Sequence, residues 1–128
     1  NIECVERISK PVRPQAVWQR SKDVLKASVD YGLRTKTGMM VGLGETNKEV
    51  YDTMDEMQDL GIDIFNIGQY LQPTKKHLKV DRYVTPEQFM RFKEYGLSIG
   101  FKVVESGPMV RSSYMADKQA EKMSSNLV

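Results

Sequence analysis

Residues 37–46, with the sequence TGMMVGLGET, combine features that could build a ligand site at the end of a strand. The apolar run ends at Gly42, a turn follows, and Thr46 and Glu49 form a capping box at the start of a helical pattern. Backbone amides and a helix N-terminus are exposed at this edge of an α/β sheet, and ligands bind there. The alternative is an ordinary strand-to-helix connection, because a few glycines after a strand are weak evidence.

Polar groups near both ends of the sequence could also contact a ligand. Asn1 and Glu3 offer an amide and a carboxylate at what reads as a strand end, and their oxygens can accept hydrogen bonds from hydroxyl or ammonium groups. The alternative for this pair is a solvated strand end. Residues 111–114, RSSY, follow a Ser-Gly-Pro turn, and the simpler interpretation of this tetrapeptide is a helix start with a serine N-cap.

A cluster of basic side chains lies in a long connection between two expected elements. It consists of Lys75, Lys76, His77, Lys79 and Arg82. Such a charge run is usually a solvated loop. The functional alternative is a surface that steers an acidic protein partner toward the site. His77 by itself makes no metal site.

Helical and strand-like patterns alternate along the chain and would position these groups. The helical patterns cover residues 14–31, 47–60 and 86–99, and the strand-like patterns cover residues 34–41, 62–68 and 101–105, with a short β-like segment at 1–5 and an extended, proline-containing segment at 10–14. A glycine ends each helical pattern, at positions 32, 61 and 100. This alternation predicts βαβ units and a parallel sheet. Since about four strands are too few to close a barrel of eight, we expect an α/β fold that is part of a barrel.

The composition describes a globular domain and excludes several classes of protein. Hydrophobic residues make up 40% and charged residues 28% of the 128 positions, which is not the composition of a disordered chain. The net charge of +2 is too small to indicate nucleic-acid binding. With Cys4 as the single cysteine, the chain can form no internal disulfide and no cysteine metal cluster of its own. The sequence begins without a methionine, and we expect a fragment of a longer protein.

Five segments carry a family resemblance, in this order and at this spacing: NIECVER, TKTGMMVGLGET, NIGQYLQPTKKHLKV, YVTPEQF and SGPMVRSSY. They resemble the C-terminal part of lipoyl synthases, a family of radical S-adenosylmethionine enzymes. The resemblance implies the last half of a partial (βα)6 barrel over residues 1–105. It also implies a C-terminal extension over residues 106–128 that carries the RSSY motif and the tail.

The resemblance implies a reaction, its cofactors and its partners. Lipoyl synthases insert two sulfur atoms into an octanoyl chain on a lipoyl carrier protein domain. They use S-adenosylmethionine and two [4Fe-4S] clusters, each held by three cysteines that this sequence lacks, so we expect the chain alone to be inactive. The implied partners are the octanoylated carrier and an electron donor such as a ferredoxin or flavodoxin, with no nucleic acid and no membrane. The implied location is the cytoplasm in bacteria or the mitochondrion in eukaryotes.

Residues near the first two strand ends are implied to bind S-adenosylmethionine. In the family, an Asn-x-Glu pair that corresponds to Asn1 and Glu3 lies beside this cofactor. Gly42 and Glu45 fit the pattern Gly-x-Ile-x-Gly-x-x-Glu, with Met40 in place of isoleucine. A backbone without a side chain at Gly42 would let the adenine lie against the strand. The alternative role of Glu45 is to cap or brace the loop.

Further roles come from the later motifs. Backbone groups of Gln69 and Leu71, at the next strand end, are implied to pair with the adenine. In lipoyl synthases the second serine of the RSSY motif ligates one iron of the auxiliary cluster, which carries over to Ser113, with Ser112 as the alternative. Arg111 is implied to orient the bound groups, or it simply pairs with a carboxylate.

Two other functions stay open from the residues alone. One is a non-catalytic half-barrel module that binds a nucleotide-like ligand or a carrier protein. The other is an aldolase or phosphate-site barrel enzyme, against which stands the absence of a lysine at an apolar strand end. Six cysteines in the upstream reading frame would distinguish the lipoyl synthase from the non-catalytic module.

Overall fold

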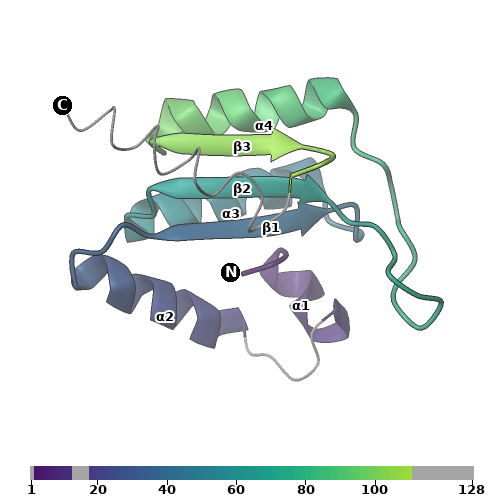
Figure 1. Cartoon of the computed structure of the whole chain (residues 1–128), viewed down its shortest axis with the longest axis horizontal. Coiled ribbons are helices and arrows are strands. Elements are labelled where there is room, and N and C mark those ends of the chain that lie inside the picture. Colours follow the sequence, from purple (N-terminus) through teal and green to yellow (C-terminus); the bar gives the residue numbers. More distant parts are fainter. Residues whose placement is uncertain (1, 13–17, 111–128) are drawn as a thin grey trace.

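The computed structural model describes residues 2–12 and 18–110 of the chain (Figure 1). The elements in order are α1 (Glu6–Val12), α2 (Trp18–Asp30), β1 (Lys36–Val41), α3 (Asn47–Leu60), β2 (Ile64–Gln69), α4 (Pro86–Ile99) and β3 (Val103–Gly107). The three strands form one parallel sheet in the order β1-β2-β3. The predicted α/β class with a parallel sheet is therefore confirmed.

The strand register places corresponding strand ends at one edge of the sheet. Lys36 of β1 pairs with Ile64 of β2, which pairs with Val103 of β3. All three strands run in the same direction, and in the view of Figure 1 α3 lies behind the sheet and α4 lies along its top, above β3. The connections that follow β1 and β2 leave from the right-hand edge in this view, so the sheet brings them together.

The main core lies between the sheet and these two helices. Val50, Met54 and Met57 of α3 are fully buried, as are Phe65 of β2 and Phe92 of α4. The predicted stop signals hold in the structure, because the glycines at 61 and 100 end α3 and α4 in the left-handed conformation. Each helix therefore ends at its glycine, and the chain returns to the sheet directly after it.

The segment before α1 lies along the free edge of β1. Glu3 forms an isolated parallel bridge with Met39: its amide donates to the Gly38 carbonyl at 3.1 Å, and its carbonyl accepts from the Met40 amide at 2.8 Å. Glu3 has a φ of 67°, in the left-handed region, where the chain turns away from the sheet into α1. Of the β-like segment expected at residues 1–5, the structure therefore shows a single bridge at Glu3.

The expectation of an extended segment around Pro11 is wrong. The helix α1 covers Glu6–Val12 and includes this proline in its last turn. Val5 and Ile8 are buried in the main core, and the Ser9 hydroxyl donates to the Glu6 carbonyl at 2.8 Å. Packing against the core and local hydrogen bonding therefore outweigh the low helix propensity of proline here.

Candidate functional site

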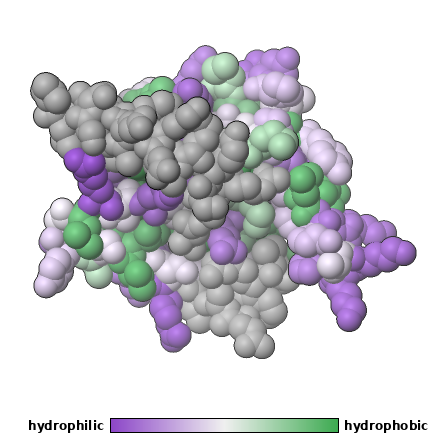
Figure 2. All heavy atoms as spheres, in the orientation of Figure 1, coloured by the Kyte–Doolittle hydropathy of each residue, from purple (hydrophilic) through white to green (hydrophobic). Residues whose placement is uncertain are grey.

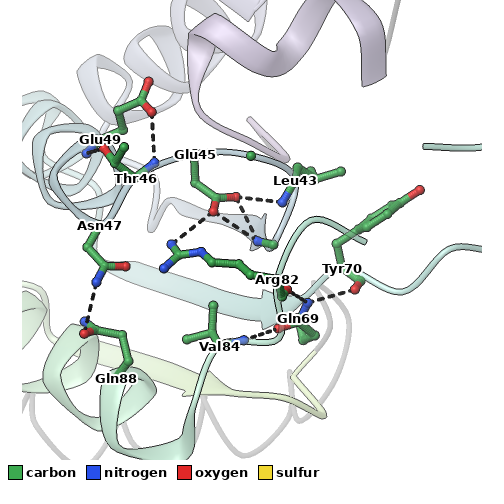
Figure 3. Close-up of polar contacts among 12 residues, drawn as sticks. Leu43, Glu45, Thr46, Asn47, Glu49, Gln69, Tyr70, Arg82, Val84 and Gln88 are labelled. Atoms are coloured by element: carbon green, nitrogen blue, oxygen red, sulfur yellow. Dashed lines mark hydrogen bonds and ion pairs between the residues drawn. The ribbon is translucent and has the colours of Figure 1, made fainter. Parts of the chain in front are cut away.

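A turn closed by one buried carboxylate follows β1. The Glu45 side chain is only 1% exposed. Its oxygens accept from the Gly42 amide at 2.9 and 3.1 Å and from the Leu43 amide at 3.1 Å (Figure 3). These two amides are therefore bound within the loop, which is the bracing role that the sequence left open for Glu45.

The N-terminus of α3 is also satisfied by its own residues. The predicted capping box is present: the Glu49 amide donates to Thr46 Oγ1 at 3.1 Å, and the Thr46 amide donates to Glu49 Oε1 at 2.9 Å. Arg7 of α1 then donates to both Glu49 oxygens, from Nε at 2.8 Å and from Nη2 at 2.9 Å. It also donates to the Gly44 carbonyl at 2.9 Å. Arg7 thereby fastens α1 to the glycine-containing turn and the cap.

This ion pair predicts a loss of stability in acid. Hydrogen bonds from Arg7 and from the Thr46 amide lower the pKa of Glu49 from its usual 4.5 to about 2. Above pH 4.5 the folded and unfolded states are both ionised at this group and the pair contributes fully; as the pH falls toward 2, only the unfolded state takes up the proton, so the contribution disappears. We expect a loss of about 1–2 kcal/mol, reduced by solvent screening of the exposed Arg7.

Denaturant unfolding measured between pH 2 and pH 6 checks this prediction. Glu49→Gln keeps a residue that can form the capping box but removes the charge, so its stability should change less over this pH range. An equally steep pH dependence in the variant and in the unchanged chain would contradict the role of Glu49.

A second buried side chain ties the connection between β2 and α4 to the strand ends. Gln69 is 3% exposed, and its Oε1 accepts from the Val84 amide at 2.9 Å. Its Nε2 donates to the carbonyls of Arg82 at 2.9 Å and Tyr70 at 3.0 Å. Figure 3 shows this side chain between β2 and the returning loop, so Gln69 fixes the start and the end of the connection.

The two loops meet at Gly42. Its carbonyl accepts from the Asp81 amide at 2.8 Å, and Arg82 Nη2 donates to Glu45 Oε2 at 3.1 Å. Gly42 has a φ of +99°, and a Cβ atom there would lie 2.3 Å from Gln69 Nε2 and 2.5 Å from the Arg82 carbonyl oxygen. Glycine is therefore required at this position by the packing of the two loops.

Several known proteins are similar in sequence to nearly the whole chain. No protein-family model matches the chain. The lipoyl synthase of Flavobacterium johnsoniae is 53% identical over 119 residues, which cover 92% of this chain and 41% of that protein. Over this stretch, the chain is similar to the C-terminal part of lipoyl synthases.

Two further lipoyl synthases show the same pattern of coverage. The protein of Rubrobacter xylanophilus is 52% identical over 123 residues, which cover 94% of this chain and 38% of the relative. The protein of Francisella tularensis subsp. mediasiatica is 53% identical over 121 residues, with 92% and 37% coverage. The chain thus spans about 40% of the length of the lipoyl synthases that it matches.

The structure brings together three of the residues that the family resemblance singled out. Gly42, Glu45 and Gln69 lie in one hydrogen-bonded group at the carboxyl ends of β1 and β2. Glu3 lies at the edge of β1, whereas the Leu71 side chain is 50% exposed beyond β2. Asn1, Arg111, Ser112 and Ser113 lie outside the described residues.

Arg82 is a member of this group that sequence reasoning missed. The sequence placed Arg82 in the basic cluster, but its guanidinium turns inward to Glu45 and is 32% exposed. Arg82 lies between the apolar residues Val80, which is partly buried, and Val84, which is buried, whereas Lys75 and Lys76 have no such neighbours. These valines were the signal in the sequence that Arg82 lies closer to the core. The sequence also gave no role to Arg7.

Two glycines lie on the sheet face away from α3 and α4, near the carboxyl ends of the strands. Side chains alternate along each strand, and Phe65 and Ile67 belong to the core between the sheet and these helices, so Gly68 lies on the other face. The register places Met40, Gly68 and Gly107 side by side near the carboxyl ends. Two of these three positions, Gly68 and Gly107, have no side chain.

The described residues do not fit a metal cluster. Among residues 2–12 and 18–110, no group of three or more His, Cys, Asp or Glu side chains could hold a metal ion. Cys4 is buried beside β1.

Within the residues that the structure describes, no helix has both the length and the apolar character needed to span a membrane.

Proposed function

We propose that these 128 residues act within a lipoyl synthase, which inserts two sulfur atoms into the octanoyl chain of a lipoyl carrier protein domain by S-adenosylmethionine radical chemistry. The observation that carries this proposal is 53% identity to a lipoyl synthase across 92% of the chain. The loop group around Gly42 and Gln69, at the carboxyl ends of a parallel sheet, supports it, because this is where α/β proteins bind their ligands.

We propose further that the sheet is part of a (βα)6 barrel, with the barrel residues at 1–105 and an extension at 106–128. The parallel bridge of Glu3 to Met39 supports a further strand on the free edge of β1. The strand β3 continues to Gly107, two residues past the proposed boundary at 105. The family reaction would take place in the bacterial cytoplasm or the mitochondrion.

The residues of this chain would hold and orient the cofactor. Asn1 and Glu3 would accept hydrogen bonds from its polar groups, and the backbone at Gln69 and Leu71 would line the adenine beside the Gly42 turn. The bound S-adenosylmethionine and the two iron–sulfur clusters would supply the radical and the sulfur. Thiolates for the clusters would come from a cysteine-bearing part outside this chain, because Cys4 is its single cysteine.

Activity of the full-length protein tests the proposal. Here the full-length protein means the polypeptide that contains these 128 residues together with the cysteine-bearing part. Reconstituted anaerobically and given a reductant, it should cleave S-adenosylmethionine and convert an octanoylated carrier domain to the lipoylated form. A reading frame without six upstream cysteines, or a protein with intact clusters that inserts no sulfur, would refute the proposal.

The connection between β2 and α4 is suited to meet the carrier domain. Lys75, Lys76 and Lys79 are exposed on it, and hydrophilic side chains project from this end of the molecule in Figure 2. The connection is internally braced. The Tyr70 hydroxyl donates to the Leu78 carbonyl at 2.6 Å, and Gln72 Nε2 donates to the His77 carbonyl at 3.0 Å. Ordered positive charges of this kind would speed the encounter with an acidic carrier.

Reversing these three charges should slow carrier association. In the full-length protein, glutamate at positions 75, 76 and 79 should lower the association rate constant by about tenfold at low salt and weaken its salt dependence, while S-adenosylmethionine binding stays unchanged. Stopped-flow mixing with the carrier domain measures both effects. The control reverses three exposed cations in and beside α2, namely Arg20, Lys26 and Arg34. Equal rates for the two triple variants would show that the loop has no steering role.

A further inference from the structure

The buried carboxylate of Glu45 has one direct ion-pair partner among the described residues, Arg82, while Arg7 interacts with it only through its more distant charge. Three amide contacts satisfy its oxygens, but those donors carry no net charge. Arg82 Nη2, at 3.1 Å from Oε2, supplies the positive charge in direct contact with the carboxylate. Removing one member of a buried ion pair is strongly destabilising because the other charge is left uncompensated. The bracing of the Gly42 turn therefore depends on a residue 37 positions after Glu45 in the sequence.

The backbone around Arg82 is fixed independently of its guanidinium. The Arg82 carbonyl accepts from Gln69 Nε2, the Asp81 amide donates to the Gly42 carbonyl, and the Val84 amide donates to Gln69 Oε1. A change confined to the end of the Arg82 side chain would leave these bonds in place. The effect of the charge can thus be separated from the effect of the loop fold.

We propose that Arg82 is a positioning residue: its charge holds Glu45 against the amides of Gly42 and Leu43 and so fixes the edge of the turn on which the cofactor rests. The part of this inference that concerns the cofactor rests on the proposed function. The part that concerns the turn stands on the geometry alone.

The geometry predicts which replacement for Arg82 is tolerated. Only Nη2 contacts Glu45, and the buried Nε has no hydrogen-bond partner among the described residues. A lysine ammonium can supply one charged contact and would leave no buried Nε donor unsatisfied. Arg82→Lys should therefore preserve the turn, whereas Arg82→Met, which retains the apolar stem without the charge, should loosen it.

Amide hydrogen exchange of the chain, followed residue by residue by NMR, tests the positioning role. In Arg82→Met the amides of Gly42 and Leu43 should exchange on the order of 10- to 100-fold faster, while those of the core residues Val50 and Phe65 keep their protection. Arg82→Lys should stay within about threefold of the unchanged chain. Tyr95→Phe is the matched control, since it removes one hydrogen bond to Asp55 between α3 and α4.

Three results would overturn the inference about the turn. The first is unchanged exchange at Gly42 and Leu43 in Arg82→Met. The second is an equal acceleration at all amides, which would indicate a general loss of stability. The third is an effect of Arg82→Met that persists undiminished in a Glu45→Gln background, because Arg82 would then not act through Glu45.

Equilibrium binding of S-adenosylmethionine to the full-length protein tests the second part. Arg82→Met should weaken binding by about tenfold and Arg82→Lys should restore it, as expected when the charge positions the turn. If the unchanged protein binds no S-adenosylmethionine, the proposed function fails while the exchange result stands. If the unchanged protein and Arg82→Met bind it equally, the inference about the cofactor edge fails while the proposed function stands.

Discussion

Gly42→Ala is expected to lower the free energy of unfolding by about 3 kcal/mol, from the sum of backbone strain and overpacking. The φ of +99° disfavours any residue with a Cβ atom. The new methyl group would also lie 2.5 Å from the Arg82 carbonyl oxygen, a backbone atom that cannot move without breaking its bond to Gln69. The substitution therefore separates the two loops that form the candidate site.

Gly32→Ala is the matched control for this substitution. Gly32 has a φ of +84°, but nothing lies within 4 Å of where its Cβ would be. This variant should therefore lose only about 1 kcal/mol, the contribution of strain alone. Urea unfolding of both variants measures the difference. Equal losses of unfolding free energy in the two variants would mean that the close contacts at Gly42 add nothing to the backbone strain.

Ser113→Ala in the full-length protein is expected to abolish most sulfur insertion while leaving reductive cleavage of S-adenosylmethionine largely intact. The expectation rests on the family resemblance of the RSSY motif, since Ser113 lies outside the described residues. As a ligand, a serine oxygen would be hard among thiolates, and its loss would affect only the auxiliary cluster. The loss should reach at least about 100-fold, because removing even an outer partner of a metal ligand costs about 10- to 100-fold.

Both reactions have to be measured on the same preparation. Ser112→Ala is the control, because the two serines are neighbours and only one is expected to be the ligand. Ser113→Cys should strengthen the cluster and impair its breakdown. Wild-type sulfur insertion in Ser113→Ala, or an equal loss of cleavage and insertion, would exclude Ser113 as the iron ligand.

Local signals in the sequence predict the helix ends well. The capping box at Thr46 and the glycine at 61 predict a helix over residues 47–60, and α3 has these bounds. Strand starts are less accurate: β2 begins at Ile64, two residues after the predicted start. The Asp63 and Ile64 amides both donate to the Thr35 carbonyl, a contact between segments that no local pattern reports.

The sequence predicted where the candidate site lies but not which of its residues contact one another. Gly42, Glu45 and Gln69 do converge at the strand ends, because parallel strands place their carboxyl ends at one edge. However, the side chains of Glu45 and Gln69 are already hydrogen-bonded within the chain, and the space beside the Gly42 Cα atom is filled by Gln69 and Arg82. The partner of Glu45 is Arg82, a residue far away in the sequence, and such a pairing is fixed only by the tertiary fold. Cofactor binding by these residues stays a prediction.

The lipoyl synthase of Flavobacterium johnsoniae offers the most direct test of the assignment, because a 119-residue stretch that makes up 41% of its length can be exchanged for the matching stretch of this chain. The measurement is mass spectrometry of an octanoylated carrier domain after reaction with the hybrid. The matching stretch of the Rubrobacter xylanophilus protein, in the same position, controls for tolerance to exchange. We expect the hybrid to produce the lipoylated carrier. A hybrid with full iron content that leaves the octanoyl chain unchanged, while the control hybrid converts it, would contradict the assignment.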